Sequence, residues 1–213
     1  CTDKWMKGTV NSFYIGFVST FLATALGTVA ALGLSRPHMP FKGLIMAILI
    51  SPMIVPLIIT AAGMFFFYSK LGLTHSYTGL ILAHTALGTP FVVITVTATL
   101  TGFDNNLIRA SQSLGADTMR TFFKVIMPLI LPGVISGALF AFITSFDEVV
   151  VVLFVGSVEQ VTIPRQMWAG LRQEISPVIL CMATCLVALS IALLTTVELL
   201  RRRSERLRGI KHR

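Results

Sequence analysis

Apolar residues occupy five long blocks of the chain, separated by short polar segments. Asp, Glu, Lys and Arg are missing from residues 8–35, 43–69, 71–103, 125–146 and 175–197, which are runs of 28, 27, 33, 22 and 23 residues. An α-helix needs about 20 residues to cross the hydrocarbon core of a bilayer, so each run is long enough. The pattern predicts an all-α membrane protein with five transmembrane helices over these ranges.

The composition supports this interpretation. Of the 213 residues, 54% are hydrophobic and 12% are charged, whereas soluble domains contain about 25% charged residues. Each run is also longer than the apolar stretch of a signal peptide. We therefore expect all five runs to remain in the membrane.

The excess of basic residues points to the membrane surface and not to nucleic acid. The chain has 17 Lys and Arg against 9 Asp and Glu, and seven of the cations lie in residues 201–213. A basic cluster directly after a membrane helix is typical of a cytoplasmic tail and favours anionic headgroups. The sequence predicts membrane lipid as a partner and no nucleic acid.

The distribution of Lys and Arg among the loops predicts the orientation. The loops after the first and third runs and the C-terminal tail hold 12 of these residues, whereas the segments on the other side hold 5. Cytoplasmic loops carry the excess of Lys and Arg, so the C-terminus is predicted to be cytoplasmic. The segment from Cys1 to Lys7 would then face outward, and we expect a further helix upstream, making six in the parent chain.

Residues 103–128, between the third and fourth runs, have a pattern that a simple connection lacks. Asp104 and Asp117 stand where helix N-caps are expected, and Gly115 stands where the first helix would end. Apolar positions recur at helical spacing after each aspartate: Leu107, Ile108, Ser111 and Leu114, then Met119, Phe122, Phe123, Ile126 and Met127. The pattern predicts two short helices that meet at a glycine, an elbow on the cytoplasmic side.

A second patterned segment, residues 156–176, is predicted to lie on the outer side. Pro164 suits the first turn of a helix, and Met167, Trp168 and Leu171 follow at helical spacing. This predicts an external amphipathic helix. Trp168 is interpreted either as an interfacial belt residue or as a contact for a partner.

The elbow carries a family resemblance. It reads Arg109-Ala-Ser-Gln-Ser-Leu-Gly-Ala-Asp117 and continues as Phe122-Phe-Lys-Val-Ile-Met-Pro-Leu-Ile-Leu-Pro-Gly133. This resembles the Glu-Ala-Ala loop of bacterial ABC-importer permeases, with matches at Leu114, Gly115, Ala116, Phe122, Val125, Pro128, Pro132 and Gly133. Arg109 replaces the usual glutamate and Ser111 the second alanine. The resemblance therefore does not imply, for this chain, any salt bridge that the family's glutamate makes. It still implies the helix–glycine–helix geometry.

The resemblance extends over nearly the whole chain and implies one transmembrane domain over residues 1–213. Asn11-Ser-Phe is similar to the Asn-Ser-Leu that opens the second helix of these permeases. The segments Ser145–Phe154, Thr162–Trp168 and Glu174–Pro177 resemble the spermidine/putrescine branch, which imports small organic cations. The implied function is polyamine import across the bacterial inner membrane.

The resemblance also implies the partners. These are a second permease subunit, a cytoplasmic ATPase dimer that binds ATP and Mg²⁺, and an external substrate-binding protein. In the family the elbow sits in a groove of the ATPase and converts ATPase closure into alternating access. Carried over to this chain, the coupling residues are Leu107, Arg109, Ala110, Ser111, Leu114, Gly115, Ala116 and Asp117.

Asp147 and Glu148 interrupt an otherwise apolar stretch, 15 residues after Pro132, or roughly 22 Å along a helix. Ionised carboxylates at membrane depth are costly unless they are paired or face water. On a continuous helix the two side chains would point about 100° apart, Asp147 with Val151 and Glu148 with Val152. One hypothesis is that at least one carboxylate lines the pathway and attracts an amine substrate. The other is that one pairs with an Arg or Lys of a neighbouring helix.

Rival functions stay open. The two carboxylates would also suit an ion-coupled secondary transporter, and the permease could carry another small charged solute. A membrane enzyme is disfavoured because no nucleophile–base or metal-ligand spacing occurs, and neither a phosphate-binding loop nor a His-Glu-x-x-His motif is present. We expect no cofactor, metal or catalytic residue in this chain, and interpret His84 as a hydrogen-bonding packing residue.

Overall fold

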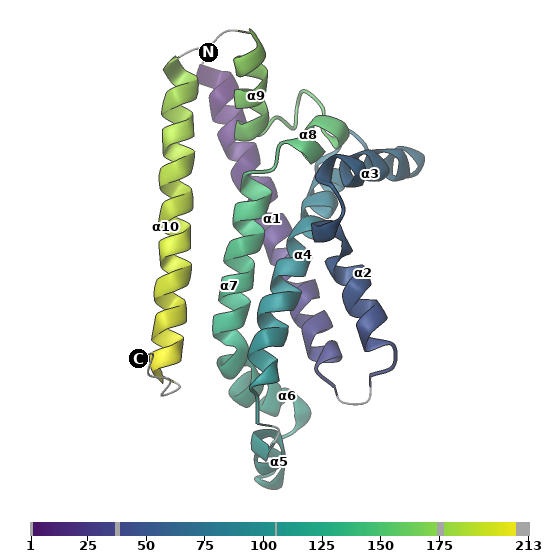
Figure 1. The fold of residues 1–213 in the computed structure, drawn as a ribbon, viewed down its shortest axis with the longest axis vertical. Coiled ribbons are helices and arrows are strands. Elements are labelled where there is room, and N and C mark those ends of the chain that lie inside the picture. The colour runs from purple at the N-terminus through teal and green to yellow at the C-terminus, as the bar shows by residue number, and fades with distance from the viewer. Residues whose placement is uncertain (1, 37–38, 105, 174–176, 208–213) are drawn as a thin grey trace.

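The computed structural model describes residues 2–36, 39–104, 106–173 and 177–207, which form helices joined by short connections, with no strand in these ranges (Figure 1). The elements are α1 (Thr2–Leu34), α2 (Lys42–Ile54), α3 (Leu57–Leu71), α4 (Tyr77–Thr101), α5 (Asn106–Ser113), α6 (Thr118–Thr121), the π-helical turn η1 (Phe122–Ile126), α7 (Met127–Phe146), α8 (Val150–Val155), α9 (Ile163–Gln173) and α10 (Pro177–Leu207). Four of the predicted spans form as long apolar helices: Asp3–Leu34, Tyr77–Thr101, Thr118–Phe146 and Pro177–Thr196.

The second predicted span is sharply bent. Helices α2 and α3 meet at an angle of 105° across residues 55 and 56, and they make a fifth span if the pair crosses the membrane as one unit. Pro56 disfavours a helical conformation at the residue before it, and Val55 is accordingly extended, with φ −70° and ψ 135°. A charge-free run therefore contains a break that its hydrophobicity alone does not indicate.

Helices α1, α4 and α7 form the centre of the bundle (Figure 1). They approach closely because small residues lie at their contacts. A β-carbon added to Gly137 would lie 2.8 Å from Val92 Cα, and one added to Gly27 would lie 2.6 Å from Val92 Cβ. The backbones of α1 and α7 thus both pack directly on Val92 of α4.

A polar cluster ties the same three helices together. The His84 Nδ1 atom of α4 lies 2.7 Å from the Ser145 hydroxyl of α7, which lies 3.0 Å from the Ser19 hydroxyl of α1. His84 is 1% exposed. Polar contacts of this kind hold membrane helices together, which agrees with the interpretation of His84 as a packing residue.

The outer surface of the bundle is apolar, as a protein in contact with lipid requires. Large side chains such as Phe17, Phe21 and Leu180 are more than half exposed. The C-terminal end of α1, the start of α2, the elbow and the C-terminal end of α10 lie at one end of the molecule, and α9 lies at the other (Figure 1). The described parts of the three segments that the Lys and Arg distribution assigned to one side are therefore at the same end.

The predicted amphipathic helix forms as α9, with Pro164 as its second residue. Met167 packs on the cluster that contains Phe142 and Phe146 of α7. Trp168 is 43% exposed. The guanidinium carbon of Arg172 lies over the Trp168 ring, 5.4 Å from the ring centroid. Both interpretations of Trp168 remain compatible with this position. The last residues of the predicted 156–176 segment, and residues 208–213 of the tail, lie outside the described residues.

Candidate functional site

The elbow contains the predicted helix–glycine–helix joint. Helix α5 ends in a Schellman motif, in which the Ala116 N–H donates to the Ser111 carbonyl at 3.1 Å and the Gly115 N–H donates to the Gln112 carbonyl at 2.9 Å. This motif needs a residue in the left-handed conformation after the helix, and Gly115 has φ +81°. A β-carbon on Gly115 would meet no atom within 4 Å. The joint therefore depends on the backbone conformation of Gly115 and not on lack of space.

The second half of the elbow is capped and tied to the first. The Asp117 carboxylate accepts a hydrogen bond from the Arg120 N–H at 2.7 Å, which confirms its predicted role as an N-cap. The Asp104 carboxylate likewise accepts from the Asn106 N–H at 2.9 Å, before α5. The hydroxyls of Ser111 and Thr121 lie 2.9 Å apart and join α5 to α6. Hydrogen bonds therefore fix both helix ends and connect the two short helices of the elbow.

The apolar residues of the elbow divide between two faces, which corrects the prediction of one stripe on each helix. Ile108, Phe122 and Ile126 are half-buried toward the bundle. Four apolar residues are exposed instead: Leu114 (89%), Met119 (67%), Phe123 (60%) and Leu107 (44%). The reason is that α5 and α6 lie below the bundle and touch it along one edge (Figure 1).

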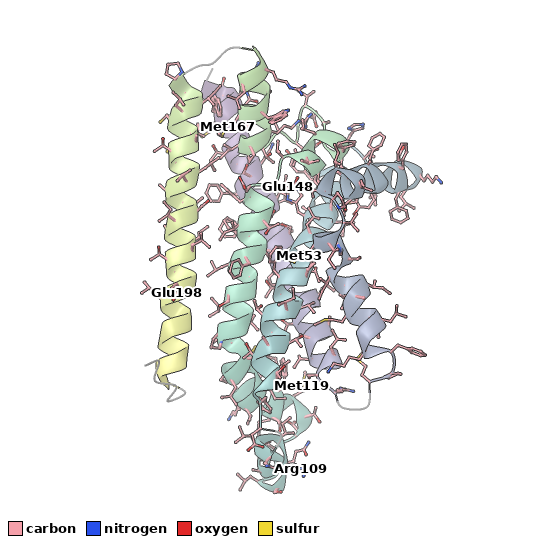
Figure 2. All side chains as sticks on the ribbon, in the orientation of Figure 1. Met53, Arg109, Met119, Glu148, Met167 and Glu198 are labelled. Atoms are coloured by element: carbon pink, nitrogen blue, oxygen red, sulfur yellow. The ribbon has the colours of Figure 1, made fainter. Side chains whose placement is uncertain are left out.

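The exposed face also carries some of the remaining predicted coupling residues. Arg109, Ala110 and Asp117 are exposed, while Ser111 and Ala116 are half-buried. Arg109 lies at the far end of the elbow in Figure 2, with Met119 closer to the bundle. We call the exposed set Leu107, Arg109, Ala110, Leu114 and Met119 the elbow tip. Apolar side chains exposed together indicate a surface for a protein partner.

Asp147 and Glu148 lie in a break between two helices, and not on one continuous helix as predicted. Helix α7 ends at Phe146 and α8 begins at Val150. The Glu148 carboxylate accepts a hydrogen bond from the Val151 N–H at 2.9 Å, so it satisfies one of the free N–H groups at the start of α8. A side chain that caps a new helix favours interruption of the old one.

The break gives the two carboxylates different environments. Glu148 is 6% exposed, whereas Asp147 is exposed. Neither forms an ion pair with a Lys or Arg among the described residues. Figure 2 shows Glu148 at the junction of α7 and α8. The predicted pairing of faces, Asp147 with Val151 and Glu148 with Val152, does not apply, because no helix connects them.

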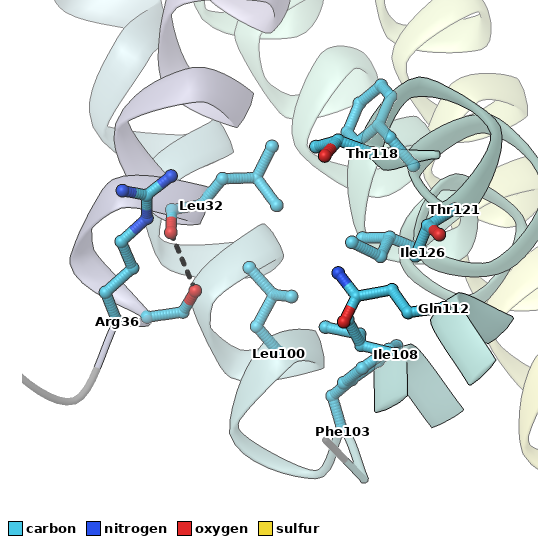
Figure 3. Close-up of a pocket in the computed structure, with 11 residues that line it drawn as sticks. Leu32, Arg36, Leu100, Phe103, Ile108, Gln112, Thr118, Thr121 and Ile126 are labelled. Atoms are coloured by element: carbon cyan, nitrogen blue, oxygen red, sulfur yellow. Dashed lines mark hydrogen bonds between the residues drawn. The ribbon is translucent and has the colours of Figure 1, made fainter. Parts of the chain in front are cut away.

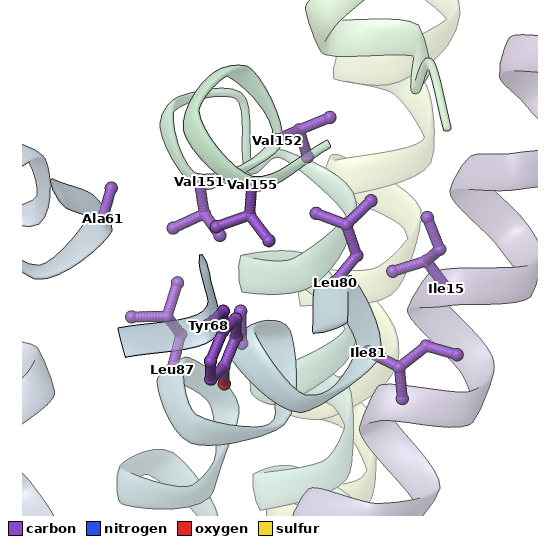
Figure 4. Packing of buried hydrophobic residues seen from close by; sticks show 10 residues of the cluster. Ile15, Ala61, Tyr68, Leu80, Ile81, Leu87, Val151, Val152 and Val155 are labelled. Carbon is purple, nitrogen blue, oxygen red and sulfur yellow. The ribbon is translucent and has the colours of Figure 1, made fainter. Parts of the chain in front are cut away.

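Helix α8 is held in place by an apolar cluster. Val151, Val152 and Val155 are fully buried, and they pack against Leu80 of α4 and Tyr68 of α3 (Figure 4). The bent α3 supplies one wall of this cluster. The position of the Asp147–Glu148 break thus depends on the bend between α2 and α3.

At the end of the molecule opposite the elbow, a group of hydrogen bonds joins α1 to the segment before α9. These bonds were not predicted from the sequence. The Asn11 side-chain amide donates to the carbonyls of Glu159 (2.9 Å) and Val161 (3.0 Å) and accepts from the Tyr77 hydroxyl (2.9 Å). The neighbouring Ser12 hydroxyl accepts from the Ile163 N–H at 2.9 Å. These bonds hold the segment between α8 and α9 against α1. An Asn-Ser pair inside an apolar run was the available signal.

The chain matches the family model described as "Binding-protein-dependent transport system inner membrane component" over residues 23–206. It is 31% identical over 202 residues to the spermidine/putrescine transport system permease protein PotC of Haemophilus influenzae, covering 95% of this chain and 79% of that relative. It is 28% identical over 193 residues to the putrescine transport system permease protein PotI of Escherichia coli strain K12, covering 87% and 68%. A sulfoquinovosyl glycerol transport system permease, SmoH of Agrobacterium fabrum, is 29% identical over 143 residues, covering 67% and 50%.

Solved structures share the fold. An inward-facing MetNI methionine ABC transporter has a TM-score of 0.69 at 22% identity, covering 98% of this chain and 96% of that one. An amino acid ABC transporter has a TM-score of 0.69 at 16% identity, covering 95% and 94%. Given the family match over most of its length, the chain belongs to the inner membrane components of binding-protein-dependent transport systems, and it is a multi-pass permease subunit of an ABC importer.

Proposed function

We propose that this permease imports polyamines of the spermidine/putrescine class across the bacterial inner membrane. The observation that carries the proposal is the similarity to a spermidine/putrescine permease over 95% of the chain. The exposed Asp147 at the α7–α8 break adds a carboxylate that can attract a polycation. The chain itself supplies the path, and ATP hydrolysis takes place in partner subunits that hold ATP and Mg²⁺.

Within the proposed pathway the two carboxylates have different roles. Asp147 is the residue that meets the substrate amine, because its carboxylate is exposed and has no cationic partner among the described residues. Glu148 instead positions α8, because it is buried and bound to the backbone of that helix. This assignment favours the pathway hypothesis for Asp147 over the ion-pair hypothesis.

The elbow tip is the proposed contact for the cytoplasmic ATPase dimer. Leu114 and Met119 can enter an apolar groove, and the Gly115 joint sets the angle between the two short helices. The hydrogen bond between Ser111 and Thr121 joins α5 to α6, so that the two short helices move together. Because η1 continues directly into α7, movement of the elbow is transmitted to the helix that ends at Phe146, next to Asp147. This couples ATPase closure to alternating access.

Transport assays on the reconstituted importer test the proposed substrate class. We expect ATP-dependent uptake of labelled putrescine or spermidine that continues after the proton and sodium gradients are collapsed. Unlabelled sulfoquinovosyl glycerol, the substrate named for one relative, should not compete. Uptake that stops with the ion gradient would support the secondary-transporter alternative. Competition by this anionic sulfonated glycoside, with none by polyamine, would assign the permease to another solute.

The proposed orientation places the elbow and the C-terminus in the cytoplasm, the second permease beside this chain, and the binding protein outside. Single cysteines at positions 70 and 165 should react with an impermeant thiol reagent in right-side-out vesicles, whereas cysteines at 120 and 206 should not. All three native cysteines, Cys1, Cys181 and Cys185, are first changed to serine as the background. Labelling of position 120 from outside would reverse the orientation.

A further inference from the structure

A pocket of about 330 Å³ lies between the elbow and the ends of two membrane helices. Its wall is formed by Leu32 and Arg36 at the end of α1, Leu100 and Phe103 at the end of α4, and Ile108 and Gln112 of the elbow. Figure 3 shows Leu32 and Leu100 between Arg36 on one side and Gln112 on the other. The pocket therefore separates the moving elbow from the helices that cross the bilayer.

The pocket is amphipathic. Leu32, Leu100 and Ile108 are half-buried and make an apolar interior, while Arg36 and Gln112 are exposed at its edge. Arg36 forms no ion pair within the part of the chain that the structure describes. The guanidinium is free to bind an anion from outside, and the guanidinium geometry suits phosphate.

The pocket lies at a membrane boundary. The charge-free run of α1 ends at residue 35 and that of α4 at residue 103, so the apolar wall meets the hydrocarbon edge. The described residues at this end also carry a positive excess: Arg36, Lys42, Arg109, Arg120 and Lys124 against Asp104 and Asp117. Basic pockets between membrane helices attract anionic lipid headgroups.

We propose that this pocket is a binding site for an anionic phospholipid. The phosphate group binds Arg36, with Gln112 as a hydrogen-bond donor, and part of an acyl chain covers Leu32, Leu100 and Ile108. A bound lipid would contact α1, α4 and α5 together, so it would hold the elbow in a fixed position relative to the bundle. The inference concerns the lipid environment and holds whatever solute the permease carries.

The test measures binding of phosphatidylglycerol to the purified importer complex, by native mass spectrometry and by the lipid-induced rise in Tm. We expect phosphatidylglycerol to bind and to raise Tm, and phosphatidylcholine to do neither. Arg36→Gln should weaken phosphatidylglycerol binding at least fivefold. Thr118→Trp, which fills the pocket from α6 without changing charge, should weaken it similarly.

Lys42→Gln is the matched control, because it removes one positive charge at the same end from a residue outside the pocket wall. Equal weakening by Arg36→Gln and Lys42→Gln would mean diffuse attraction, and the proposed site would be wrong. Displacement of the lipid by inorganic phosphate at equal concentration would leave no role for the acyl chain and would also overturn the proposal. The proposal would also be wrong if the complex showed no selective binding of phosphatidylglycerol. That result is expected if a protein partner fills the pocket.

Discussion

Replacing Gly115 by proline is expected to reduce uptake to background while the subunit still inserts and accumulates. Gly115 has φ +81°, whereas proline fixes φ near −65°. Proline also removes the N–H that donates to the Gln112 carbonyl at 2.9 Å. The angle between α5 and α6 would be lost, and we expect the ATPase activity of the complex to become independent of the binding protein. Uptake and ATP hydrolysis are measured on the same preparation.

Gly115→Asn is the matched control for this result. Asparagine adopts the left-handed conformation more readily than other non-glycine residues, and its β-carbon would meet open space within this chain. We expect most of the coupled activity to be retained. Normal uptake with Gly115→Pro would remove the elbow from the coupling mechanism. A defect in Gly115→Asn as severe as that of Gly115→Pro would show that bulk at the ATPase contact, and not backbone conformation, decides the outcome.

Asp147→Asn is expected to lower polyamine uptake about fivefold at substrate concentrations below KM, with the complex intact. At an effective dielectric of about 20, two unit charges about 4 Å apart interact by about 4 kcal/mol. If a quarter of this remains after desolvation, about 1 kcal/mol is lost, which corresponds to about fivefold in binding. Asparagine retains the size and hydrogen bonding of the side chain, so the variant isolates the charge. The measurement is initial uptake of spermidine, with copurification of the partner subunits in parallel.

The neighbouring Glu148 provides the comparison. Glu148→Gln keeps an oxygen that can accept from the Val151 N–H, so near-normal uptake and accumulation are expected. Glu148→Ala leaves that N–H without its partner and should destabilise the subunit by about 1 kcal/mol, seen as a lower Tm. A fivefold loss with Glu148→Gln would make both carboxylates part of the pathway. Dissociation of the complex with Asp147→Asn would instead favour the ion-pair hypothesis.

The sequence by itself determined the features that depend on local chemistry. Four spans form where charge-free runs predict them, because a run of about 20 apolar residues satisfies its backbone only as a helix in lipid. The Asp117 cap and the left-handed Gly115 were also predictable, since each involves residues no more than five positions apart. The family resemblance rested on this same local pattern.

Only the tertiary structure decided features that depend on distant residues. Proline can bend a helix locally, but the 105° angle at Pro56 and its packing could not be read from the sequence, and the bend brings Tyr68 of α3 to the valines of α8. That packing positions α8 so that Glu148 is buried as its N-terminal cap while Asp147 stays exposed. The sequence alone does not show which of two adjacent carboxylates will be buried. Which face of the elbow is covered likewise depends on how α5 meets the bundle. Each of these outcomes comes from packing between segments far apart in the chain, which hydrophobic periodicity and capping patterns do not encode.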